Sequence, residues 1–271
     1  MKRINLVPWL ISAALCTALF AGCHKPAAEP LIIHRLPTCG ATRRVPLGNS
    51  VEARPIECVI VGNGWDVTFM LAAIHGDEPA GTALLRDLLT YLLQQPELMQ
   101  GRRVILLPIA NPDGIAEQTR LNANGVDLNR NFPGDNRQNN AENGLSALSE
   151  PEAVAIEKVI TKYAPERIVS IHQFTETGPQ ALSERYPKGC IDYDGPAKDL
   201  ARQMAKHCDL PVERLGARAG SLGSYCGLTL EVPVITFELP AHAHLLDSYS
   251  LWEKYGAALV AAVIYPEKIT R

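Results

Sequence analysis

The sequence predicts a single α/β domain built on a mainly parallel, mixed sheet with helices on both faces. Two apolar runs of strand length, residues 67–74 and 104–110, are the first basis for this, because continuously apolar strands are typical of sheets covered on both faces. The second basis is the segment between them, where leucines recur at helical spacing from Leu84 to Leu93. An alternation of strand and helix favours parallel neighbours joined by crossovers.

The composition agrees with one globular domain. The chain has 271 residues, 46% hydrophobic and 20% charged, which is enough to bury one sizeable core. The formal charge is −3, and removal of the two positive residues Lys2 and Arg3 with a leader would make it −5. No block of basic residues occurs, so nucleic acid is not expected as a partner.

Residues 1–22 are expected to be a signal peptide of the lipoprotein type. Lys2 and Arg3 precede an apolar run, and small residues follow in "FAGC". Cys23 comes directly after this Ala-Gly pair, a pattern that resembles the lipidation site of bacterial lipoproteins. The apolar run of about 17 residues is short for a membrane span, which disfavours an uncleaved anchor. We therefore expect a lipid-anchored periplasmic or outer-membrane lipoprotein that contacts the membrane through its anchor.

The mature chain is expected to consist of a tether, residues 23–37, and a catalytic domain, residues 38–271. Export implies an oxidising compartment, in which disulfides can form. Two disulfides and one free thiol are possible, their pairing is not fixed by spacing, and buried free thiols are the alternative. The cysteines concerned are Cys39, Cys58, Cys190, Cys208 and Cys226.

The second half of the domain continues the alternation of strands and helices. Residues 111–149 are rich in Asn, Gly and Asp, and a loop of that length is usually functional. Ser149 is expected to cap the next helix, with Glu152 three residues on completing a capping box. The remaining expected elements are strands at 167–171 and 234–237 and helices at 196–208 and 245–265.

Polar residues stand at the carboxyl ends of three expected strands. These are His75, His172 and Glu238, and in open α/β sheets ligands bind at that rim. Glu78 follows His75 by three residues, so a turn can bring both side chains to one ion. His75, Glu78 and His172 form a His₂Glu set, which is a ligand set of catalytic zinc that leaves a fourth position for water. The sequence thus predicts one Zn²⁺ per chain.

The motifs around these residues resemble those of the zinc carboxypeptidase family. The segments "HGDE", "NPDG", "GVDLNRNFP", "SEPEA", "SIH" and "TFELP" occur in family order between residues 60 and 239. Their short spacing, and the string "RLNANGVDLNRNFP", are most similar to the bacterial murein peptide amidase branch and related cell-wall carboxypeptidases. The resemblance implies a zinc carboxypeptidase-like fold, zinc as cofactor and a peptide with a free carboxylate as substrate.

The resemblance also implies roles for residues outside the ligand set. Glu238 would be the general base that takes a proton from water and later gives it to the leaving amine. Arg120 would stabilise the oxyanion of the tetrahedral intermediate. Asn129 and Arg130 would bind a substrate carboxylate, because arginine offers a bidentate fork to that planar group. The chain departs from digestive members in lacking their tyrosine shortly before the segment that matches Gly220-Ser221.

Three hypotheses for the function follow. The first is an exported zinc metallocarboxypeptidase or amidase that hydrolyses a peptide bond near a free carboxylate in murein stem peptides. The second is a zinc deacylase of the aspartoacylase and succinylglutamate desuccinylase type, which shares His-x-x-Glu and the Asn-Arg pair; export and "TFELP" favour the first. The third is a binding module with a decayed site, which the complete set of key residues disfavours.

Overall fold

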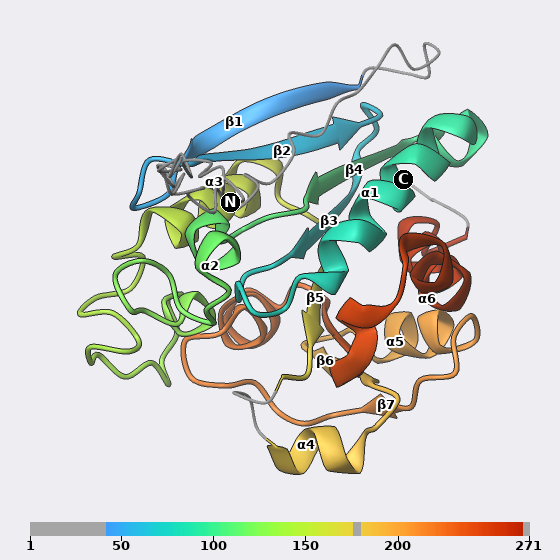
Figure 1. Cartoon of the computed structure of the whole chain (residues 1–271). Coiled ribbons are helices and arrows are strands. Elements are labelled where there is room, and N and C mark those ends of the chain that lie inside the picture. Colours follow the sequence, from blue (N-terminus) through green and yellow to red (C-terminus); the bar gives the residue numbers. More distant parts are fainter. Residues whose placement is uncertain (1–41, 176–179, 268–271) are drawn as a thin grey trace, which may run out of the picture. The chain divides into compact units, whose positions relative to one another are not determined.

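The computed structural model describes residues 42–175 and 180–267, which fold around one eight-stranded mixed sheet (Figure 1). The strand order is β1-β2-β4-β3-β5-β8-β6-β7. The pairs β4–β3, β3–β5, β5–β8 and β6–β7 are parallel, and β1–β2, β2–β4 and β8–β6 are antiparallel. The strands are β1 (Arg43–Asn49), β2 (Pro55–Val61), β3 (Asp66–Ala72), β4 (Arg102–Leu107), β5 (Arg167–Gln173), β6 (Cys190–Asp194), β7 (Val212–Glu213) and β8 (Val234–Leu239).

Helices cover both faces of the sheet, as predicted (Figure 1). Alternate residues of each strand supply the two cores. In β3, Met70 and Ala72 belong to the core beneath α1, α5 and α6, whereas Phe69 and Leu71 belong to the core beneath α3. The helices are α1 (Ala80–Gln94), α2 (Pro112–Glu117), α3 (Pro151–Tyr163), α4 (Gln180–Arg185), α5 (Lys198–Ala205) and α6 (Ser248–Val263), with shorter helical segments η1 (Pro96–Met99), η2 (Leu128–Arg130), η3 (Gly223–Thr229) and η4 (Ala241–Leu245).

The strand ends differ from the predicted ones where the backbone changes direction. β3 ends two residues before the apolar run does, because Ala73 adopts a left-handed backbone with φ +51° and turns the chain. His75 therefore lies in the turn that follows the strand. His172 and Glu238, by contrast, lie within the last residues of β5 and β8.

The sequence pattern does not predict four of the strands, namely β1, β2, β6 and β7. The reason is clearest for β6. Its sequence, "CIDYD", contains two acids and lacks the continuous apolar run by which the other strands are predicted. In the structure Ile191 packs into the core beneath α1, α5 and α6. Asp192 and Asp194 point to the opposite face, because side chains alternate along a strand, and there they line a pocket.

The expected capping box at Ser149 and Glu152 is wrong. Helix α3 has Glu150 at its N-cap position and no side-chain cap. The Ser149 hydroxyl donates to Glu150 (2.8 Å), while Glu152 and Glu150 both accept hydrogen bonds from Asn122 Nδ2 (3.1 and 2.7 Å). These buried acids tie the long loop to the start of the helix, which a local helix-start pattern does not foresee.

The four described cysteines are free thiols. Cys58, Cys190 and Cys226 are buried and Cys208 is partly buried, so the alternative of unpaired thiols holds for these four. Burial raises the pKa of Cys58 to about 11, as expected for an unreactive structural thiol. Cys39 lies outside the described residues.

The expectations for residues 1–22 and 23–37, including lipidation at Cys23, also lie outside the described residues. Within the part of the chain that the structure describes, no helix has both the length and the apolar character needed to cross a membrane.

Candidate functional site

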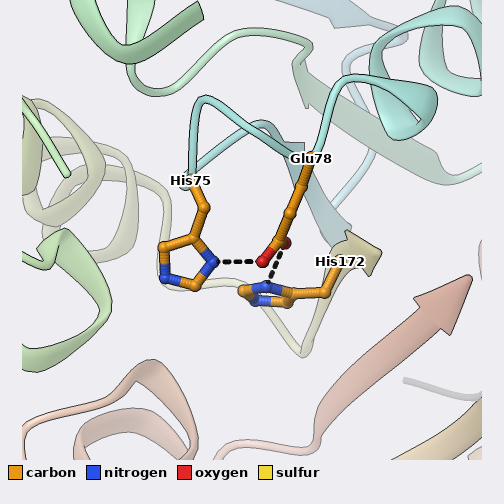
Figure 2. Close-up of side chains that lie close together, drawn as sticks. All are labelled: His75, Glu78 and His172. Carbon is orange, nitrogen blue, oxygen red and sulfur yellow. Dashed lines mark hydrogen bonds and ion pairs between the residues drawn. The ribbon is translucent and has the colours of Figure 1, made fainter. Parts of the chain in front are cut away.

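The structure brings His75, Glu78 and His172 together (Figure 2). Nδ1 of His75 lies 2.7 Å from Oε1 of Glu78, and Nδ1 of His172 lies 2.8 Å from Oε2 of the same carboxylate. One donor atom from each residue lies within 4.8 Å of the others, and all three side chains are buried. This is the spacing that three ligands of a single metal ion require.

A tight turn after β3 positions the first two of these residues. The backbone N–H of Glu78 donates to the carbonyl of His75 (3.3 Å) and closes the turn. A Cβ on Gly76 would lie 1.9 Å from the carbonyl carbon of Gly114, so only glycine lets the turn pack against the "NPDG" segment. Asn111 caps α2 there by accepting the Gly114 N–H (2.9 Å). The "HGDE" and "NPDG" motifs are therefore two sides of one packed junction.

The other ring nitrogen of each histidine also has a partner. Nε2 of His75 lies 3.0 Å from Oδ1 of Asp127, and Nε2 of His172 lies 3.1 Å from the Ser170 hydroxyl. Asp127 is held in turn by two nitrogens of Arg120, at 3.1 and 3.2 Å. Such partners fix the orientation of a ligand histidine. Asp127 was not among the residues expected in the site, although its place inside "GVDLNRNFP", the most specific motif, was a usable signal.

The charges of the cluster are those of a cation site. Burial alone would lower the pKa of His75, but the carboxylates of Glu78 and Asp127 raise it to about 9. Burial would raise the pKa of Glu78, yet the charges of His75 and His172 hold it well below its usual range. A proton thus provides the positive charge that these carboxylates require. Because Zn²⁺ replaces ligand protons when it binds, the donor set and its charge fit a zinc ion.

Glu238 lies beside this cluster on the neighbouring strand. It stands directly opposite His172 in the parallel register of β5 and β8, and its side chain lines the same pocket. Burial raises the pKa of Glu238 to about 7, with His172 lowering it and Glu78 raising it. The pocket therefore contains a carboxyl group next to the metal-ligand candidates that is not itself bonded to them.

Arg120, Asn129 and Arg130 reach the pocket from the long loop. Arg120 Nη1 donates to Oε1 of Glu78 (3.1 Å). The side-chain oxygen of Asn129 accepts the N–H of Leu222 (3.0 Å), and Arg130 Nη1 donates to the Asn129 carbonyl (2.6 Å). The structure thus gathers in one pocket every residue singled out in the folded domain: His75, Glu78, Arg120, Asn129, Arg130, His172 and Glu238.

No tyrosine among the described residues lines this pocket, in agreement with the departure seen in the sequence. Leu215 and Arg218 line it in the corresponding region. The hydroxyl of Tyr225 instead donates to Glu157 (2.9 Å), and its ring stacks on Phe132. Tyr225 is therefore a packing residue.

This fold and this pocket define a hydrolase of peptide bonds with a candidate metal site. The chain belongs to the zinc carboxypeptidase family, whose pattern matches residues 38–210, and is a metallopeptidase. It is 34% identical over 208 residues to murein peptide amidase A of Escherichia coli (strain K12). The aligned region covers 70% of this chain and 76% of that protein. It is 30% identical over 159 residues to gamma-D-glutamyl-L-diamino acid endopeptidase 1 of Lysinibacillus sphaericus, covering 41% of this chain and 40% of that protein. The crystal structure of murein-tripeptide amidase from Escherichia coli O157 superposes with a TM-score of 0.63 at 25% identity, covering 85% of this chain and 96% of that one.

Proposed function

We propose that the protein is an exported zinc metallopeptidase that hydrolyses a peptide bond near a free carboxylate in murein stem peptides. The observation that carries this proposal is the single pocket lined by the His75, Glu78 and His172 cluster, by Glu238 and by Arg130. Such a hydrolysis needs three groups: a metal site, a carboxyl group that transfers protons, and a guanidinium that binds the substrate carboxylate.

His75, Glu78 and His172 would hold one zinc ion. When bound there, zinc supplies a Lewis acid that polarises the substrate carbonyl and lowers the pKa of water. The chain contributes rigidity: Asp127 and Ser170 contact the far nitrogens of the two rings, so neither imidazole has to reorient when the metal enters.

Glu238 is assigned as the general base and then the general acid. Its carboxylate would take a proton from the water that attacks the substrate carbonyl. The same proton would pass to the nitrogen of the leaving amine as the carbon–nitrogen bond breaks. The position of Glu238 beside His172, on the sheet face that lines the pocket, supports this assignment.

The arginines are assigned to the two negative charges of the substrate. Arg120 would stabilise the oxyanion through Nη1, which faces Glu78, while its other nitrogens stay on Asp127. Arg130 and Asn129 would bind the free carboxylate of the departing side. The contact between the Asn129 side-chain oxygen and Leu222 leaves the amide N–H₂ as the donor for that carboxylate.

The substrate assignment combines the relatives with the N-terminal sequence. Two of the relatives are murein peptide amidases by name, which supports a stem peptide as substrate. The lipoprotein pattern that ends at Cys23 would place the enzyme in the cell envelope, where murein is the abundant peptide polymer. We therefore propose cleavage in the carboxyl-terminal part of a stem peptide, which releases diaminopimelate or a terminal amino acid.

Mass spectrometry of purified stem peptides incubated with the zinc-loaded protein tests this function. The expected result is a new fragment shortened from its carboxyl end, abolished by a chelator and restored by zinc. A parallel incubation with N-acetylaspartate and N-succinylglutamate tests the deacylase alternative. Turnover of these acyl amino acids without cleavage of any stem peptide would replace the proposal, and bound zinc without turnover of either class would indicate a binding module.

A further inference from the structure

The loop that carries Arg120 is anchored by a buried polar network that the chemistry assigned above does not use. Its centre is Asn122, which is 4% exposed. Two carboxylates at the start of α3 complete it, those of Glu150 (5% exposed) and Glu152 (0% exposed). Of the described residues that line the pocket, none belongs to this set of three. Their side chains can therefore act on the reaction only through another residue.

Asn122 builds a tight turn between Arg120 and Asp127. Its backbone N–H donates to the carbonyl of Val126 (3.0 Å), and its side-chain oxygen accepts the N–H groups of Asn124 (3.1 Å) and Val126 (3.0 Å). The turn reverses the chain, so the residues just before and just after it face each other. In this arrangement Nε and Nη2 of Arg120 donate to Oδ2 of Asp127, at 3.2 and 3.1 Å.

The nitrogen of the Asn122 amide fixes the same turn to α3. Nδ2 donates to Oε2 of Glu150 (2.7 Å) and to Oε2 of Glu152 (3.1 Å). Both donors and both acceptor positions of the amide are thereby used. A reversed amide would place its oxygen against two carboxylates and its N–H₂ against two N–H groups, so this orientation is the one that satisfies the buried groups.

The two acids differ in what surrounds them. Oε1 of Glu152 accepts the backbone N–H of Val51 (3.2 Å), so both of its oxygens face groups that only donate. Burial raises the pKa of Glu152, while the hydrogen bonds from Asn122 and Val51 act in the opposite direction. Oε1 of Glu150 instead contacts the Ser149 hydroxyl (2.8 Å), which can donate or accept. Position 152 therefore requires two acceptor oxygens, whereas position 150 tolerates an amide turned toward the hydroxyl.

We propose that Asn122, held by Glu150 and Glu152, is a positioning residue for Arg120 and fixes the turn that aims its guanidinium into the pocket. The inference rests on the proposed function, in which Arg120 stabilises the oxyanion. A donor of this kind is effective when it is already in place, because it then needs no reorganisation during the reaction. A displacement of about 1 Å in a reacting group can cost about 10²-fold in rate.

Steady-state kinetics of the zinc-loaded protein with a stem peptide test the inference at neutral pH. Asn122→Asp keeps the oxygen that forms the turn but turns a second oxygen toward the two carboxylates. Its kcat should fall by about 10-fold or more with KM nearly unchanged, because the oxyanion exists only in the transition state. Unchanged kcat, or a change in KM alone, would overturn the inference.

A pair of glutamine variants gives the same test without a new buried charge, and so keeps it open if Asn122→Asp does not fold. Glu152→Gln must place an N–H₂ against Asn122 or Val51 and should lower kcat. The control Glu150→Gln makes the same chemical change two residues away, can turn its amide toward Ser149, and should keep kcat. Equal kcat values in the two variants would contradict the assigned geometry.

The effect of Asn122 should depend on Arg120. In an Arg120→Ala background, Asn122→Asp should lower kcat further by less than about 2-fold, because residues that act as one unit are not additive. A further loss as large as in the wild-type background would mean that Asn122 acts through the fold in general. A lower unfolding temperature with unchanged kcat would likewise make the network structural only.

Hydrogen exchange separates this inference from the proposed function. The Nε–H of Arg120 donates to Asp127, and its NMR signal can be assigned by its absence in Arg120→Lys. In the zinc-loaded wild type this proton should exchange slowly with water, and in Asn122→Asp about 10-fold faster or more. Protection that depends on Asn122, without cleavage of any peptide, would leave the positioning role and remove the function. Cleavage with equal protection in wild type and Asn122→Asp would do the reverse.

Discussion

Asp127 contacts Nε2 of His75 at 3.0 Å, while Nδ1 of the same ring faces Glu78 at 2.7 Å. The imidazole is thus held between two carboxylates, and Arg120 donates hydrogen bonds to both of them. A ring fixed in this way presents one defined nitrogen to a metal ion.

Changing Asp127 to Asn should therefore weaken zinc without abolishing the fold. Loss of the carboxylate partner of a ligand histidine typically costs about 10- to 100-fold in metal affinity. Competition with a chromophoric chelator measures the zinc Kd directly, and Asp199→Asn is the matched control for loss of one carboxylate. An unchanged Kd in Asp127→Asn would mean that this contact does not support the metal.

The proposed zinc ligands are tested by substitution. His75→Ala and His172→Ala should each lose tightly bound zinc together with activity, because two ligands do not hold the ion as three do. Elemental analysis of the dialysed proteins gives the metal content. His207→Ala, which changes an exposed histidine, should keep one zinc per chain. If His75→Ala or His172→Ala retained one tightly bound zinc ion per chain, the ligand assignment would be wrong.

Glu238→Gln separates metal binding from chemistry. The amide has nearly the shape of the carboxyl group but cannot take a proton, so zinc content should stay at the wild-type level while kcat falls by about 10² or more. Single-turnover cleavage of a stem peptide is the measurement. A variant that turned over at nearly the wild-type rate would remove Glu238 from the mechanism.

The raised pKa of Asp194 predicts a pH-dependent stability. The ordinary value is 3.8, and burial with the charge of Asp192 raises it to about 6, against the effect of Arg214. Between these two values the unfolded chain gives up the proton before the folded one does, so the free energy of unfolding falls as pH rises through this window and then levels off. Asp194→Asn should lack this fall. Urea unfolding at pH 4, 5, 6 and 7 should show the variant gaining on the wild type up to about pH 6; a difference that is constant with pH would contradict the prediction.

Export predicts a defined N-terminus. The mature protein should begin at a diacylglyceryl-modified Cys23 and fractionate with membranes, whereas Cys23→Ser should not carry the lipid. Mass spectrometry of the N-terminal peptide decides between them. A native chain that begins at Met1 would refute the lipoprotein assignment.

The residues of the site were more predictable than the strands that carry some of them. His75, Glu78, His172 and Glu238 follow apolar runs and stand inside specific motifs, so periodicity and pattern both point to them. β6 could not be predicted from the sequence because its alternate residues include Asp192 and Asp194, and a strand is predicted from a run or an alternation of apolar side chains. The contact between Asp127 and His75 could not be predicted from local sequence, since it joins two residues about fifty positions apart that only the fold brings together.

The most direct test of the proposed function compares a murein stem peptide with the same peptide whose terminal carboxylates are amidated. If Arg130 and Asn129 bind a free carboxylate, loss of its charge-assisted hydrogen bonds should lower kcat/KM by about 10²-fold or more. Arg130→Ala should remove most of this difference, and Arg130→Lys should restore only part of it, because a point charge cannot replace the guanidinium fork. The account predicts rapid cleavage of the free peptide and slow cleavage of the amidated one. Equal cleavage of the two would contradict the carboxylate clamp, and failure to cleave either, with rapid release from ordinary L-peptides, would make the enzyme a general carboxypeptidase.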